Sequence, residues 1–261
     1  MSEWMIYGAN GYTGELTARR AKLQGMKPIL AGRNEKSIQA LADELDLPFR
    51  CFSLEDDHLV ECIKDVSVVV HSAGPFSKTA KPMMEACIKA KTHYLDITGE
   101  ISVFEASQKL SHQAREAKIV ICPGVGFDVI PTDCVAAQLK LKMPDAIHLR
   151  MGFDSNGSFS RGTAKTSIEG IPEGCKIRKD GKLTTIPLGA LDRKIDFGNG
   201  EKLAVAIPWG DISTAFYSTS IPNIEVYMPT SAIALKSMKL ANYVRWLLGC
   251  LLYTSPSPRD S

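Results

Sequence analysis

Three glycines near the start of the chain, Gly8, Gly11 and Gly14, are spaced three residues apart and follow a short apolar run. A dinucleotide pyrophosphate requires a backbone without side chains and a helix N-terminus whose free N–H groups face the anion. The spacing therefore predicts a strand, a phosphate-binding turn and a helix. Three residues between the glycines are also predicted to contact the cofactor, namely Asn10, Tyr12 and Thr13.

The elements around these glycines fit the same prediction. Leu16, Ala18 and Leu23 are expected to form the buried stripe of the helix, and residues 28–31 form a second apolar strand. Strand, turn, helix and strand fill a unit of about 30 residues, which is the context that a dinucleotide fingerprint requires. The usual fingerprint is G-x-G-x-x-G, however, so an ordinary glycine-rich loop is the alternative.

The end of the second strand bears on the choice of cofactor. An NAD enzyme places Asp or Glu there to bind the ribose 2′-hydroxyl, and an NADP enzyme places Arg near the 2′-phosphate. Here the residues are Gly32, Arg33 and Asn34, with no carboxylate. Arg33 carries a planar, permanently charged group suited to phosphate, so we expect NADP(H). A solvated surface arginine is the alternative.

A second stretch of small residues follows an apolar strand predicted over residues 66–71. Small residues there let the ribose or the nicotinamide lie against the backbone, and a proline fixes the turn. A turn without a ligand would use the same residues. His71, at the strand end, is expected to be a core histidine with its hydrogen bonds satisfied. The predicted cofactor loop comprises Ser72, Ala73, Gly74 and Pro75.

Several motifs together resemble the saccharopine dehydrogenase NADP-binding-domain family, in its branch of saccharopine dehydrogenase-like oxidoreductases and trans-acting enoyl reductases. The resemblance extends from the first strand to about Arg245 and implies a Rossmann-type domain and an NADP-dependent oxidoreductase. The substrate is not implied by the family name. The motifs are Tyr7 to Gly14, Ala31 to Asn34, His71 to Phe76, Tyr94 to Glu100, Pro123 to Asp128 and Ser160 to Ala164.

Polar side chains that could work beside a nicotinamide are few. Asp128 lies in a glycine-rich turn after an apolar strand, where partial burial would suit a proton donor or acceptor. An Asx turn to Ile130 would explain the same residue structurally. Asp96 and Lys165 are weaker catalytic candidates, and the hydroxyls around Lys165 could equally cap a helix. The catalytic residue therefore stays unassigned.

The order of apolar segments predicts an α/β protein with two domains. Strands and helices alternate up to about residue 122, as in a doubly wound parallel sheet. We therefore assign residues 1–145 to a Rossmann-type NADP-binding domain. Residues 146–249 are strand-rich and are assigned to an incomplete α+β domain for substrate binding and dimerisation. Within it, residues 203–217 are expected to supply strands with a turn at residues 209–211, and residues 231–248 a helix packed against protein.

Composition excludes several classes of function. The chain has 44% hydrophobic residues, 23% charged residues and a net charge of +2, which does not suggest nucleic acid as a partner. Lysines and an arginine in the last helix argue against a membrane span, although an amphipathic helix on a membrane surface stays open. Seven scattered cysteines without a C-x-x-C pair suggest reduced thiols in the cytoplasm and no metal site.

Residues 250–261 are expected to be foreign to the protein. Residues 250–260 match, residue for residue, one reading frame of a transposase sequencing adaptor. We exclude this segment from the fold prediction and expect the natural protein to continue beyond Gly249, so that this chain is a fragment. A genomic read that crosses codon 249 into the same tail would contradict this.

Two functions from different classes follow from the sequence. The first is an NADP-dependent oxidoreductase that transfers a hydride to or from a carbonyl, imine or enoyl compound. The second is an NADP-binding scaffold or regulatory protein without catalysis, associated with a lipid surface or a partner. Because one fold serves many functions, fold alone does not separate them. Substrate, reaction direction and oligomeric state are not encoded in any motif.

Overall fold

A computed structural model describes residues 3–154 and 174–254. For residues 244–254 it describes only the helix that they form. The chain divides into two compact units, Met1–Pro131 and Thr132–Ser261. The sequence places the boundary after residue 145, so the division comes earlier than predicted. The helix Ile130–Lys142 belongs almost entirely to the second unit, because its buried Ala136 packs with Leu149 and Ile224 of that unit.

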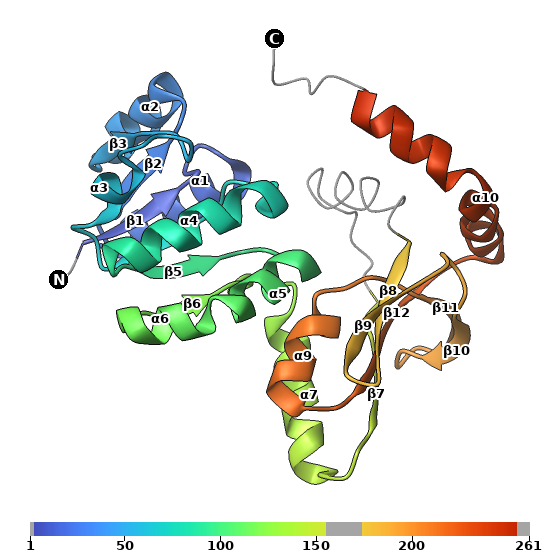
Figure 1. The fold of residues 1–261 in the computed structure, drawn as a ribbon. Coiled ribbons are helices and arrows are strands. Elements are labelled where there is room, and N and C mark those ends of the chain that lie inside the picture. The colour runs from blue at the N-terminus through green and yellow to red at the C-terminus, as the bar shows by residue number, and fades with distance from the viewer. Residues whose placement is uncertain (1–2, 155–173, 255–261) are drawn as a thin grey trace. The chain divides into compact units, whose positions relative to one another are not determined.

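The first unit is built on a parallel sheet of six strands in the order β3-β2-β1-β4-β5-β6 (Figure 1). Every pairing within it is parallel, and the order reverses between β1 and β4. This is the doubly wound arrangement predicted from the sequence, with its switch point beside the glycine turn. The strands are β1 (Trp4–Tyr7), β2 (Ile29–Gly32), β3 (Phe49–Cys51), β4 (Val68–His71), β5 (His93–Asp96) and β6 (Ile121–Cys122).

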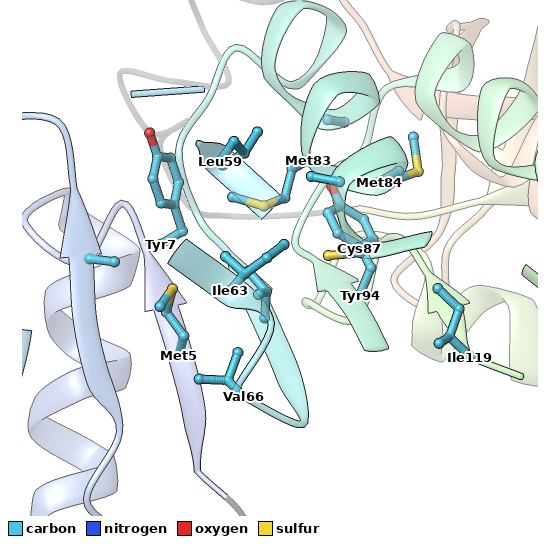
Figure 2. Close-up of a cluster of buried hydrophobic side chains, with 14 of the residues drawn as sticks. Met5, Tyr7, Leu59, Ile63, Val66, Met83, Met84, Cys87, Tyr94 and Ile119 are labelled. Atoms are coloured by element: carbon cyan, nitrogen blue, oxygen red, sulfur yellow. The ribbon is translucent and has the colours of Figure 1, made fainter. Parts of the chain in front are cut away.

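Helices cover both faces of this sheet. One face packs Ile6 and Leu30 against two helices through residues such as Ala18 and Ile38. The other face packs its strands against four helices, and Figure 2 shows the buried side chains of this cluster. The first pair is α1 (Tyr12–Leu23) and α2 (Glu35–Leu45), and the second group is α3 (Leu59–Ile63), α4 (Phe76–Ala90), α5 (Ile101–Lys109) and α6 (Ser111–Ala117).

The buried stripe of α1 differs from the prediction. Ala18 is buried as predicted, but Leu16 and Leu23 are 51% and 80% exposed, and the helix buries Gly14 and Ala21 in their place. Small side chains allow the helix axis to lie close to the sheet, and this close packing positions the N-terminus of α1 over the end of β1. The apolar leucines on the outer face contribute little to this packing.

The second unit contains a sheet in the order β10-β11-β12-β8-β9, with β7 also paired to β12. All pairings are antiparallel except that of β7 with β12. An α+β second unit was predicted. Its strands are β7 (His148–Gly152), β8 (Cys175–Lys179), β9 (Lys182–Ile186), β10 (Asp192–Asp196), β11 (Glu201–Ala206) and β12 (Asn223–Pro229), and its helices are α7 (Ile130–Lys142), α9 (Asp211–Thr219) and α10 (Ala232–Thr254).

One prediction for the second unit is wrong. After the turn predicted at residues 209–211 the chain forms a helix rather than a strand, because β11 ends at Ala206 and α9 begins at Asp211. Ile212 and Ala215, three residues apart, are fully buried, which is a helical rather than a strand spacing. In α10, Leu235 is buried and Asn242 bonds the backbone of Leu188, so its first half packs against protein as expected.

Candidate cofactor site

The glycine turn has the geometry that an anion-binding loop requires. Gly8 has a φ of +82°, a conformation that side chains rarely adopt, and a Cβ there would lie 2.8 Å from the Ala73 Cβ. A Cβ on Gly14 would lie 2.2 Å from the Gly8 carbonyl oxygen. Both positions therefore admit only glycine, and the turn is held by the Gly8 N–H, which donates to the Ala31 carbonyl at 2.7 Å.

The N-terminus of α1 is open toward this turn. Gly11 precedes the helix, and it has no side chain that could cap the first amides. Those amides lack partners within the helix by geometry, and together with the helix dipole they favour an anion. Tyr12 and Thr13 are exposed, so the turn presents its backbone to solvent. These residues fit a pyrophosphate, as the sequence predicts.

Arg33 follows β2 and is exposed, and no acidic side chain in the described part of the chain forms an ion pair with it. Asn34 does not compete for the same position, because its side chain caps α2 by accepting from the Ser37 N–H at 3.0 Å. Asn10 lies beside the end of β2, since a Cβ on Gly32 would lie 3.2 Å from its Oδ1. Asn10 and Arg33 therefore belong to one corner of the sheet edge.

The loop after β4, formed by Ser72, Ala73, Gly74 and Pro75, lies against the glycine turn. The Ser72 N–H donates to the Tyr7 carbonyl at 2.8 Å, and Ala73 occupies the space that a side chain on Gly8 would need. Pro75, joined to Gly74 by a cis peptide bond, precedes α4. The structure thus brings both predicted groups of backbone contacts, the glycine turn and this loop, to the carboxyl ends of β1 and β4.

Asp96, at the end of β5, is fully buried and holds the fold together. Its carboxylate accepts from the Tyr94 hydroxyl at 2.6 Å, from the Thr98 N–H at 2.9 Å and from the Gly124 N–H at 2.8 Å. Burial raises the pKa of this carboxyl group above its ordinary value, and the hydrogen bonds from the three donors offset only part of that rise. A group this enclosed joins the loops that follow β5 and β6, and no face of it is left for a substrate.

Asp128 lies at the same edge of the sheet but is exposed. A Cβ on Gly99 would lie 2.6 Å from the Asp128 Oδ2, so the carboxylate rests against the loop that follows β5. Partial burial against this loop raises the pKa of Asp128. An accessible carboxyl group with a raised pKa can donate or accept a proton nearer neutral pH than an ordinary aspartate. Lys165, the third candidate, lies outside the described residues.

His71 differs from the expectation in one respect. It is fully buried, as predicted, but neither ring nitrogen has a hydrogen-bond partner among the described residues. Its ring packs against those of Tyr7, Phe76 and Tyr94, with centroids 5.5, 5.5 and 6.0 Å away. Burial in this aromatic setting lowers the pKa of His71 to about 3, so the ring is neutral.

Glu100 is a site residue that sequence reasoning missed. Its carboxylate reaches back to the start of α4 and accepts from two backbone N–H groups there. In the sequence it stood out only by its place after a strand, in Thr98-Gly99-Glu100, and at the end of one motif of the family resemblance. Neither signal pointed to its partners, which are more than twenty residues away. Among the described residues no group of histidine, cysteine and acidic side chains is placed to bind a metal ion, and no helix is long and apolar enough to cross a membrane.

Comparison with known proteins agrees with this geometry. Residues 4–122 match the model of the saccharopine dehydrogenase NADP binding domain. These residues are a saccharopine dehydrogenase NADP binding domain. The matched segment contains β1 to β6, and hence the glycine turn, Arg33, the loop after β4 and Glu100. The match supports a nicotinamide dinucleotide as the class of cofactor.

Curated relatives match about half of the chain. A trans-acting enoyl reductase of Mycobacterium ulcerans is 32% identical over 140 residues, which is 50% of this chain and 34% of the relative. One of Mycobacterium tuberculosis is 32% identical over 144 residues, or 52% of this chain and 34% of the relative. The matched stretch thus spans about a third of each relative.

A solved structure extends the likeness to the second unit. Apo saccharopine dehydrogenase (L-Glu forming) of Saccharomyces cerevisiae superposes with a TM-score of 0.65 at 14% identity, over 92% of this chain and 57% of that one. At this identity the likeness concerns the fold alone.

Proposed function

We propose that this chain is the cofactor-binding part of an NADP-dependent oxidoreductase that acts on a carbonyl, imine or enoyl compound. The observation that carries the proposal is the open N-terminus of α1 above a turn in which Gly8 and Gly14 leave no room for a side chain. The family match and the enoyl reductase relatives support the same function. A bound nicotinamide would supply hydride transfer, and the chain supplies binding, orientation and a proton.

We propose NADP rather than NAD because of the corner at the end of β2. Arg33 is exposed and without an ion pair in the described ranges, and no acid stands at the end of β2, where an NAD enzyme would carry one. A 2′-phosphate on Arg33 forms charge-assisted hydrogen bonds, which contribute about 1.5–3 kcal/mol.

The remaining residues receive roles by their position. The pyrophosphate is bound by backbone N–H groups at the start of α1, those of Tyr12, Thr13 and Gly14. Asn10 and Gly11 lie beside them, and the Gly11 N–H donates to the Gly8 carbonyl within the turn. The loop of Ser72, Ala73, Gly74 and Pro75 receives the nicotinamide end against its backbone. We propose Asp128 as the group that exchanges a proton with the substrate, because it combines exposure with a raised pKa. Asp96 has no such access.

Fluorescence titration of the chain with NADPH and with NADH tests the proposal. We expect tighter binding of NADPH, and Arg33→Ala should weaken NADPH binding by about 10- to 100-fold while NADH affinity stays unchanged. Arg20→Ala, which removes an exposed arginine in the last turn of α1, is the matched control. Equal loss for both cofactors would refute the role of Arg33, and no binding of either cofactor to the wild-type chain would refute the function.

A further inference from the structure

The N-terminus of α4 is occupied by a carboxylate from another loop. The Phe76 N–H donates to Glu100 Oε1 and the Ser77 N–H donates to Glu100 Oε2, each at 2.9 Å. Phe76 is the first residue of α4, and Glu100 precedes α5. Both oxygens of one carboxylate thus satisfy two amides that a helix cannot pair internally, and the negative charge complements the helix dipole.

Glu100 is itself held in place. Its N–H donates to Thr98 Oγ1 at 3.0 Å, and the Thr98 N–H donates to the buried carboxylate of Asp96. Asp96 also binds the Gly124 N–H. The loop after β5 is therefore anchored to the sheet below and to the loop after β6, so Glu100 is a fixed acceptor rather than a mobile surface side chain.

The start of α4 in turn fixes the loop of Ser72, Ala73, Gly74 and Pro75. The Thr79 hydroxyl, in the first turn of α4, donates to the carbonyls of Ala73 at 2.6 Å and Pro75 at 3.0 Å. Ala73 lies against Gly8, on the side where a Cβ on Gly8 would point. A continuous series of contacts therefore runs from Asp96 through Glu100 and α4 to the glycine turn, all within the first unit.

We propose that Glu100 is a positioning residue for the nicotinamide end of the cofactor, an assignment that rests on the proposed function. It holds the loop after β4 against the glycine turn before the cofactor binds. It also fills the N-terminus of α4 with its own charge. Since α1 has no such cap, the pyrophosphate is directed to α1 rather than to α4. A loop ordered in advance lowers the cost of binding.

Two ligands of different length test this role. NADPH reaches the loop after β4, whereas adenosine 2′,5′-bisphosphate has no nicotinamide. Its 2′-phosphate needs Arg33 and its 5′-phosphate needs the glycine turn, but no part of it reaches the loop after β4. We expect Glu100→Ala to weaken NADPH binding by about tenfold and to leave the binding of adenosine 2′,5′-bisphosphate unchanged. Glu100→Gln retains one acceptor oxygen for one of the two amides, so its NADPH affinity should fall between wild type and Glu100→Ala.

Hydrogen exchange of the free protein supplies a second readout. Glu100→Ala should speed amide exchange over residues 73–79 and leave β1 unchanged. The control is Glu85→Ala, which removes a partly exposed acid of α4 that pairs only loosely with Lys81, at 3.8 Å. It should change neither exchange nor affinity.

Three results would overturn the inference. Equal losses for NADPH and adenosine 2′,5′-bisphosphate would indicate general destabilisation of the domain. Unchanged affinities in Glu100→Ala, with NADPH bound normally by wild type, would show that the cap does not affect the cofactor. Failure of the wild-type chain to bind NADPH would instead refute the proposed function, and the positioning role with it.

Discussion

Acidification should destabilise the first unit through His71. This ring is neutral in the folded protein, where burial lowers its pKa from 6.5 to about 3. In the unfolded chain it takes up a proton as the pH falls below 6.5, so the unfolded state binds more protons and is favoured. Between pH 7 and pH 5 this linkage lowers the free energy of unfolding by about 2 kcal/mol, and the decline continues toward pH 3.

The variant His71→Phe isolates this contribution. Phenylalanine keeps an aromatic ring among Tyr7, Phe76 and Tyr94 but does not titrate. The decrease in the free energy of unfolding from pH 7 to pH 5 should therefore be smaller by about 2 kcal/mol in this variant than in wild type. Other titrating groups contribute equally to both proteins and do not affect this difference. Removing two unpartnered buried nitrogens should also stabilise the variant at pH 7.

Unfolding has to be followed in the first unit alone, because the chain has two units and a single transition is not assured. Met5, Met83 and Met84 are fully buried there, and peroxide oxidises them only when the unit unfolds. Measuring their oxidation at increasing urea concentration gives the urea midpoint of unfolding of the first unit. In wild type this midpoint should fall by about 1 M from pH 7 to pH 5, if the free energy of unfolding changes by about 2 kcal/mol per M urea. The same shift in His71→Phe would refute the assignment.

Two further substitutions test the site. Gly14→Ala places a Cβ 2.2 Å from a backbone oxygen that no rotamer change can move. NADPH titration should therefore show at least a tenfold loss of affinity, and urea unfolding should show a free energy of unfolding lower by about 1–3 kcal/mol. Wild-type affinity in this variant would refute the turn geometry. Asp128→Asn should lower substrate-dependent NADPH oxidation by about 10²- to 10⁴-fold with unchanged NADPH affinity, and unchanged turnover would remove its catalytic role.

Local sequence signals were sufficient for the parts of the site made of backbone. Glycine is required at position 14 by a steric contact with the carbonyl of Gly8, a few residues earlier, and at position 8 by its own positive φ. Asn34 caps α2 through Ser37, three residues away. Apolar runs of strand length, separated by helical segments, predicted the parallel sheet because buried strands need apolar side chains on both faces. Short-range geometry of this kind is visible in sequence.

The sequence could not assign the polar side chains, because their roles depend on partners far along the chain. Asp96 is structural since it meets Gly124, and Glu100 is a helix cap since α4 begins above it, 24 residues earlier. The same holds for exposure: Asp128 and Asp96 both follow apolar strands, yet one is exposed and the other fully buried.

The sequence alone thus determined the class of fold, the glycine turn and the presence of Arg33 at the end of β2, because each depends on residue type and short spacing. The tertiary structure alone decided which carboxylate faces solvent, which one holds loops together and which one caps a helix. Desolvation and hydrogen bonding depend on what surrounds a group in space, and strands adjacent in the sheet bring together residues that sequence keeps apart.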